Sequence, residues 1–251
     1  MNRLLGIHAV KEALEAGRAL ERVVVARGKG GDRVQEIVEL ARQRGVPVRF
    51  EERAQLDRLA GSSQHQGVVA LGGAKRVATL EDLLAATAGK ASRLVVLLDG
   101  VEDPHNLGAV IRSALAAGAD GVVIPERRAA GLTDVVGRAS AGALEHLPVA
   151  RVGNLARTME ELKEGGYWLI GLDESAERSY TDADFTGAVG IVMGGEGKGL
   201  HELTRKRCDY LVSIPTVGPV RSLNVSVAAG VVLFEAVRQR SQKQHATDKR
   251  R

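Results

Sequence analysis

The chain has 251 residues, of which 44% are hydrophobic and 26% charged, and this is typical of a globular protein with one large or two modest domains. Aromatic residues make up only 3%, which argues against an RNA-binding platform built on base stacking. The net charge of +4 fits a polyanionic partner but does not require one.

The first 72 residues alternate helical and extended patterns. Apolar residues at helical spacing predict a helix in GIHAVKEALEAG, ending at Gly17, and a second helix over residues 32–45. Short apolar runs predict strands at 22–26, 46–50 and 68–71. We therefore expect a small α/β domain over residues 1–72, followed by a linker over 73–92 that contains a helix at 79–88.

From residue 93 onward the sequence repeats a strand followed by a helix. Candidate strands lie at 94–98, 121–124, 167–172, 191–193 and 210–214. Their nearly continuous apolar character indicates burial on both faces, which is typical of a mostly parallel sheet between helices. The pattern predicts an α/β domain over residues 93–241 and a polar, basic, disordered tail over 242–251.

Polar side chains follow the first of these strands. In DGVEDPHNLGAVIRSA an apolar stripe predicts a helix that begins near His105 or Asn106, and Arg112 lies off that stripe. Asn106 and Arg112 converge on one site only if Asn106 precedes or caps the helix, because six residues inside a helix separate them by about 120°. An ordinary helix cap beside a solvated arginine explains this segment equally well.

The run IVMGGEGKGL predicts a buried strand that enters a glycine-dense turn containing Glu196. Glycine allows the main chain to approach a ligand closely. The run lacks the spacing of a phosphate-binding loop, and Leu200 stands where a dinucleotide fingerprint needs its third glycine. A solvated glutamate in a turn is the simpler interpretation.

The run SIPTVGPVRSLNVSVAAG places Ser222 and Asn224 at the start of an apolar helix, where capping alone explains them. That helix carries more apolar surface than one buried face needs, which indicates contact with another subunit. The six histidines and Cys208 have no metal-ligand spacing, so we expect no metal site.

Taken together, DGVEDPHNLGAVIRSALAAGADGVVIP, IVMGGEGKGL and SIPTVGPVRSLNVSVAAGVVLFEAVRQR resemble the motifs of the SpoU family of RNA ribose 2′-O-methyltransferases, in the SPOUT superfamily. GIHAVKEAL and HQGVVA look like the N-terminal substrate-binding domain of the RlmB-type members, which has a ribosomal-protein-L30-like fold. The resemblance covers nearly the whole chain except the tail.

The resemblance implies a C-terminal domain with a deep trefoil knot that binds S-adenosylmethionine, and a homodimer with a shared active site. Carried over by motif, the implied catalytic residues are Asn106, Arg112, Glu196, Ser222 and Asn224. The implied cofactor-binding residues are Leu172, Gly194, Gly195, Ile214 and Leu223. The implied reaction is methylation of a guanosine ribose in 23S ribosomal RNA, in the loop that binds peptidyl-tRNA.

Three alternatives stay open. The same chemistry could act on a guanosine in the D-loop of transfer RNA, or on an adenosine as in antibiotic-resistance methyltransferases. The chain could also be an RNA-binding ribosome-assembly factor without catalytic activity. The start MNRLLGIHAV lacks the apolar core of a signal peptide, the lone cysteine excludes an intrachain disulfide, and no run is long enough to span a membrane, so we expect a soluble cytoplasmic protein.

Overall fold

The computed structural model describes residues 2–72, 77–219 and 222–248. The chain divides into two compact units, and each is described by itself. The first unit comprises Met1–Arg76 and Leu132–His146, and the second comprises Val77–Gly131 and Leu147–Arg251. Residues 73–76 of the expected linker lie outside the described residues.

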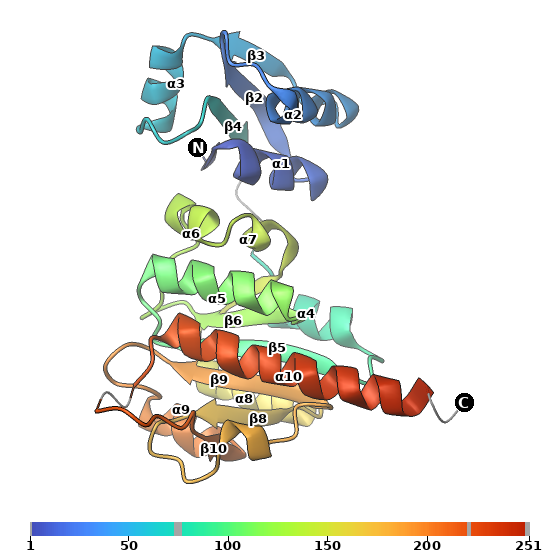
Figure 1. The fold of residues 1–251 in the computed structure, drawn as a ribbon, viewed down its shortest axis with the longest axis vertical. Coiled ribbons are helices and arrows are strands. Elements are labelled where there is room, and N and C mark those ends of the chain that lie inside the picture. The colour runs from blue at the N-terminus through green and yellow to red at the C-terminus, as the bar shows by residue number, and fades with distance from the viewer. Residues whose placement is uncertain (1, 73–76, 220–221, 249–251) are drawn as a thin grey trace. The chain divides into compact units, whose positions relative to one another are not determined.

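The first unit contains a four-stranded sheet in the order β1-β4-β2-β3, in which β1 and β2 run antiparallel to β4 and β2 runs parallel to β3. α1 and α2 cover one face of this sheet and α3 covers part of the other (Figure 1). The elements are β1 (Asn2–Leu5), α1 (Ile7–Glu15), β2 (Leu20–Ala26), α2 (Asp32–Gln43), β3 (Val48–Glu51), α3 (Arg53–Ala60) and β4 (Val68–Gly72).

Two of these elements, β1 and α3, are absent from the sequence-based prediction. β1 is four residues long and depends on pairing with β4, whose partner residues lie more than sixty positions away in the chain. α3 has eight residues and leaves only Leu56 and Ala60 buried, so its apolar pattern is short. Leu56 and Ala60, one helical turn apart, nevertheless pack against Val24 and Val69 of the sheet.

The segment Leu132–His146 packs with the first unit, although the sequence-based division places it in the domain over 93–241. It contains α6 (Asp134–Ala139) and α7 (Ala143–His146). Arg18 Nη1 lies 2.7 Å from Glu145 Oε1, and both side chains are nearly buried. His146 contacts Glu12 of α1. Polar contacts of this kind have no short-range pattern, so sequence periodicity does not reveal them.

The second unit contains a six-stranded sheet in the order β10-β8-β9-β5-β6-β7, and every neighbouring pair is parallel. This confirms the expected mostly parallel sheet. Its strands are β5 (Arg93–Asp99), β6 (Gly121–Pro125), β7 (Val149–Val152), β8 (Trp168–Leu172), β9 (Ala188–Gly194) and β10 (Tyr210–Val212). Its helices are α4 (Leu80–Thr87), α5 (Pro104–Ala116), α8 (Leu155–Glu164), η1 (Tyr180–Asp182), α9 (Glu202–Arg207) and α10 (Val225–Asp248).

Helices cover both faces of this sheet, because its strands carry apolar side chains on both faces. α5 and α10 pack against each other on one face, and α4 and α8 lie on the other (Figure 1). On the α4 and α8 side, Leu83, Leu97 and Met159 belong to one fully buried cluster. Burying such side chains contributes roughly 1.5–3 kcal/mol each.

After β10, at the edge of the sheet, the chain returns to its middle. β10 neighbours only β8, whereas α10 packs on α5 and β9. We call the connecting residues 213–224 the return segment; residues 220–221 of it lie outside the described part. Its residues Ser213, Ile214, Ser222 and Leu223 lie near the carboxyl ends of β8 and β9. The predicted trefoil knot depends on how this segment is threaded, and the knot stays a prediction.

α10 continues to Asp248, so residues 242–248 are helical rather than disordered, and 249–251 lie outside the described residues. Gln, Lys and Ala in this stretch are good helix formers and extend an existing helix without a new nucleus. Arg240 anchors α10 by donating hydrogen bonds to the carbonyl oxygens of Phe185, Arg93 and Gly187, at 2.8–3.0 Å. Within the described residues, no helix has the length and apolar character to cross a membrane.

Candidate functional site

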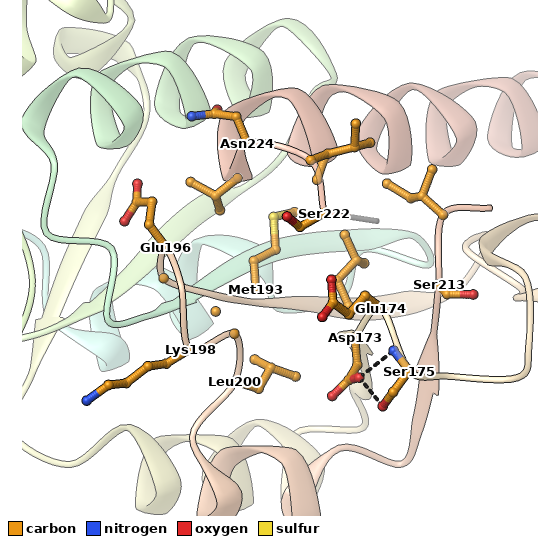
Figure 2. Close-up of a pocket in the computed structure, with 18 of the residues that line it drawn as sticks. Asp173, Glu174, Ser175, Met193, Glu196, Lys198, Leu200, Ser213, Ser222 and Asn224 are labelled. Carbon is orange, nitrogen blue, oxygen red and sulfur yellow. Dashed lines mark hydrogen bonds between the residues drawn. The ribbon is translucent and has the colours of Figure 1, made fainter. Parts of the chain in front are cut away.

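A cavity of about 520 Å³ lies in the second unit, at the edge of the sheet where β8, β9 and β10 end. The loop after β8, the loop after β9, and the return segment with the first turn of α10 form its wall (Figure 2). Ligands of parallel sheets usually bind at this edge. All but two of the residues predicted for the site line the cavity: Leu172, Gly194, Gly195, Glu196, Ile214, Ser222, Leu223 and Asn224.

Glycine is required where β9 enters this wall. A Cβ atom on Gly194 would lie 1.9 Å from the carbonyl carbon of Gly199, and one on Gly195 would lie 1.9 Å from the carbonyl oxygen of Gly100. Backbone atoms cannot move aside as the tip of a flexible side chain can. The two glycines therefore let the β9 loop fold back on itself and against the end of β5, which leaves main-chain groups facing the cavity.

Three of the predicted catalytic residues form one hydrogen-bonded cluster. Asn106 Nδ2 donates to the Glu196 carboxylate, and Asn224 Nδ2 donates to Asn106 Oδ1 at 3.0 Å. Asn224 also accepts from the backbone N–H of Ser226 at 2.9 Å, so it caps α10 as well. The sequence left open whether Asn224 caps a helix or belongs to the site, and in the structure it does both. Ser222 lines the same cavity (Figure 2).

Arg112 is not brought to this cluster within one chain. α5 begins at Pro104 with Asp103 as its cap, slightly earlier than expected, because proline favours the first helical turn. Asn106 therefore lies inside the helix, and Arg112 follows about 9 Å along the axis and about 120° around it. The Arg112 side chain is exposed, does not line the cavity, and has no hydrogen bond or ion pair to any described residue.

Asp99 and His201, which were not predicted for the site, hold both ends of the β9 loop. Asp99 is buried at the end of β5. Its backbone oxygen accepts from Gly195 N at 2.8 Å, and its Oδ2 accepts from His201 N at 2.9 Å. The His201 ring nitrogen Nδ1 lies 2.9 Å from Asp99 Oδ1. The loop that carries Glu196 is thus braced against β5.

The loop after β8 supplies acidic groups at the other end of the cavity (Figure 2). Burial alone would raise the pKa of Asp173, but hydrogen bonds from Ser175 and the nearby Arg205 guanidinium outweigh burial and lower this pKa below its ordinary value. Ser175 Oγ and N lie 2.5 and 2.9 Å from Asp173 Oδ1, and Arg205 Nε lies 2.9 Å from Oδ2. Asp173 is therefore a fixed carboxylate, and Glu174 beside it also lines the cavity.

The sequence contained a signal for this acidic loop. Asp173, Glu174 and Ser175 follow directly after a predicted parallel strand, at the edge where ligands bind. Asp99 has the same positional signal, because it directly follows the predicted strand 94–98, but its contact with His201 spans 102 positions and has no local signature. Among the described residues, no group of three His, Cys, Asp or Glu side chains is placed to hold a metal ion.

The fold and the cavity define an α/β protein with a pocket of small-molecule size at the carboxyl edge of its parallel sheet. A model of the SpoU rRNA Methylase family matches residues 93–234, and one described as RNA 2′-O ribose methyltransferase substrate binding matches residues 3–77. The chain therefore belongs to the SpoU rRNA methylase family, which confirms the resemblance drawn from its motifs.

Individual relatives agree with this assignment. The 23S rRNA (guanosine-2′-O-)-methyltransferase RlmB of Xanthomonas campestris is 47% identical over 241 residues, which cover 94% of this chain and 96% of that protein. The crystal structure of the SpoU methyltransferase AviRb from Streptomyces viridochromogenes, in complex with AdoMet, superposes with a TM-score of 0.82 at 29% identity and covers 96% of this chain and 90% of that one. The A. aeolicus TrmH/SpoU tRNA modifying enzyme covers 66% of this chain and 84% of that one, with a TM-score of 0.56 at 28% identity.

Proposed function

We propose that this protein transfers a methyl group from S-adenosylmethionine to the ribose 2′-hydroxyl of a guanosine in 23S ribosomal RNA. The observation that carries the proposal is the Asn106–Glu196–Asn224 cluster beside a glycine-walled cavity. It occurs in a chain that is 47% identical, over almost its full length, to a relative named for this reaction. We place the target in the peptidyl-tRNA-binding loop and the enzyme in the cytoplasm, where that RNA is processed.

The cavity suits this cofactor in size and charge. Its volume of about 520 Å³ lies within the range of small-molecule sites. S-adenosylmethionine is a sulfonium with an amino-acid part, and the cavity offers Asp173, Glu174 and Glu196 as carboxylates, with Lys198 as a cation. Leu172, Leu223 and Ile214 would supply apolar contacts, while Gly194 and Gly195 expose main-chain hydrogen-bonding groups.

The protein has to align two reactants and handle one proton. When bound, S-adenosylmethionine supplies an already activated methyl group. A 2′-hydroxyl is a poor nucleophile until it loses its proton. We assign Asn106, Glu196 and Asn224 to orienting the ribose. Ser222, which lines the cavity beside Asn224, is assigned to the same role. Because an arginine guanidinium stays protonated at neutral pH, we assign Arg112 to holding a phosphate and stabilising the developing alkoxide rather than to acting as a base.

A homodimer would bring Arg112 to a site that a single chain leaves without it. Arg112 is exposed on α5, which packs against α10. Val227 and Phe234 on α10 are 52% and 50% exposed, and seven residues separate them, so they lie on one face of the helix. An exposed apolar stripe of this kind is typical of an interface. We infer that α5 and α10 meet a second copy and that Arg112 acts in the partner's cavity.

Transfer RNA is the second candidate substrate. The tRNA-modifying A. aeolicus structure matches only 66% of this chain, whereas the first unit matches a substrate-binding model over residues 3–77. This extra unit favours ribosomal RNA. A ribosome-assembly factor without catalytic activity is disfavoured by the intact hydrogen bonds among Asn106, Glu196 and Asn224.

The decisive test combines calorimetry with RNA mapping. We expect the purified protein to bind S-adenosylmethionine and to methylate 23S rRNA from cells that lack the gene, and we expect one guanosine 2′-O-methyl group to disappear from ribosomal RNA in those cells. Loss of a methyl group from the D-loop of transfer RNA instead would select the second substrate. Absence of cofactor binding would reject the enzymatic function altogether.

A further inference from the structure

A second hollow, of about 390 Å³, lies in the first unit between β2, β3 and α3. It forms because α3 is only eight residues long and covers the sheet near β2 and β4, so it leaves the part beside the edge strand β3 open. Val24 and Leu59 contribute apolar atoms to its lining. We call this feature the arginine hollow, for the side chains that surround it.

Strand alternation and register explain why three arginines meet there. Arg22 and Val24 are two positions apart on β2 and therefore point to the same face. Val24 is paired with Arg49 on the parallel strand β3, so Arg49 points to that face as well. On α3, Arg58 follows Gln55 by three residues, which places both on the helix face that closes the hollow.

The charges in the arginine hollow are strongly unbalanced. Three guanidinium groups face a single carboxylate, that of Glu51. Arg22, Arg49 and Arg58 make no ion pair with any acidic side chain among the described residues, whereas Arg27 nearby pairs with Glu52. Arg49 and Arg58 are exposed and Arg22 is half-buried, so all three side chains keep surface that a partner can reach. Arginines that served only solubility could be spread over the surface, whereas these three surround one hollow.

The chemistry of the hollow fits phosphodiester groups better than bases. Guanidinium forks match phosphate oxygens in a bidentate manner. The one aromatic side chain nearby, Phe50, pairs in register with Val25 and so lies on the opposite face of the sheet. We propose that the arginine hollow binds the sugar-phosphate backbone of the RNA substrate and fixes how the RNA is held, without reading its sequence. This inference rests on the proposed function.

The test is the salt dependence of RNA binding by two matched variants. Arg22→Ala/Arg49→Ala removes two charges from the hollow. Arg33→Ala/Arg42→Ala removes two exposed charges from α2, which covers the opposite face. Binding to a 23S rRNA transcript is measured by fluorescence anisotropy over a range of salt concentrations. For the hollow variant we expect the slope of log K against log[salt] to fall by roughly 1–2, and affinity at 0.1 M salt to fall roughly 30-fold.

Cofactor binding by calorimetry separates the two hypotheses. Both variants should bind S-adenosylmethionine like the unmodified protein, and the α2 variant should keep its RNA affinity. Equal slopes for the two variants, or no RNA binding by the unmodified protein, would overturn the role of the hollow. Failure of the unmodified protein to bind cofactor, with RNA binding intact, would overturn the proposed reaction instead. If the double variant does not fold, the same salt-dependence measurement is made on Arg58→Ala, which alters neither strand and should also lower the slope.

Discussion

At the scale of single residues, the side-chain amide of Asn106 determines how the cluster is arranged. It donates to Glu196 and accepts from Asn224, so both of its polar atoms are engaged. Three segments far apart in the chain, α5, the β9 loop and the start of α10, are thereby joined by one side chain. In the proposed reaction, a ribose beside the cavity would meet oxygen and nitrogen atoms whose positions are already fixed, which would lower the entropic cost of alignment.

Arg112→Ala should reduce methyl transfer by roughly 10²–10³-fold, because removal of one preorganised donor has this effect in other enzymes. The side chain is exposed, so stability should stay unchanged, and cofactor affinity should stay unchanged because Arg112 is assigned to an RNA phosphate rather than to the cofactor. Turnover and calorimetry on the same preparation would measure both. Arg112→Lys should also be slow, since an ammonium lacks the fork geometry. Near-normal turnover by Arg112→Ala would remove this residue from the mechanism.

Asp173→Asn should destabilise the protein in a pH-dependent way. Because the pKa of Asp173 is lowered in the folded state, its contribution is complete above the ordinary value of 3.8 and disappears as the pH falls through the folded value. The loss at pH 7 should be at most about 1 kcal/mol, since Arg205 is partly exposed. Thermal unfolding at pH 7 and pH 3 measures the difference. A gap between the two proteins that does not shrink at pH 3 would contradict this account.

At the scale of elements, the parallel sheet brings three loops to one edge, and the ends of β5 and β9 are held in register. Asp99 pairs with Gly194 in the ladder and braces the loop that follows. The sequence could predict most strands of this sheet because their apolar runs are nearly continuous. β7 escaped prediction because it is four residues long and contains the exposed Arg151.

Asp99→Ala should lower the free energy of unfolding by about 1 kcal/mol or more, because the partly buried N–H of His201 loses its acceptor. It should also weaken cofactor binding, since the β9 loop loses its brace. Asp120→Ala is the matched control: Asp120 accepts from Leu94 N at 2.8 Å at the opposite end of β5. The control should lose stability but keep its affinity. Equal affinities for both variants, measured by calorimetry, would show that the brace has no role in the site.

At the scale of the whole molecule, the proposed homodimer rests on the exposed apolar residues Val227 and Phe234 of α10. Phe234→Glu should convert a dimer to a monomer, because it places a charge in the apolar contact. Methyl transfer should then fall as much as in Arg112→Ala. Leu203→Glu, at a comparably exposed position on α9, should change neither property. Light scattering after size exclusion measures the mass, and an active Phe234→Glu monomer would exclude a shared site.

The site was only partly predictable for reasons that also lie at this scale. The glycine turn, Glu196 and Asn224 have local signatures, since each follows a strand or starts a helix. The acidic loop at Asp173 had a positional signal that depends on knowing the strand order. The brace between Asp99 and His201 joins distant positions, so it has no signature in the order of residues. In the proposed dimer the place of Arg112 would depend on a second chain, which the order of residues does not reveal either.

The return segment also has a consequence for how the protein is made. Ser213, Ile214 and Leu223 form one wall of the cavity, and the other walls come from segments that are synthesised earlier. A nascent chain that has emerged only through β9 therefore has an open groove where the finished protein has a pocket. Tight binding of a small molecule at this place therefore requires that the chain has been synthesised as far as α10.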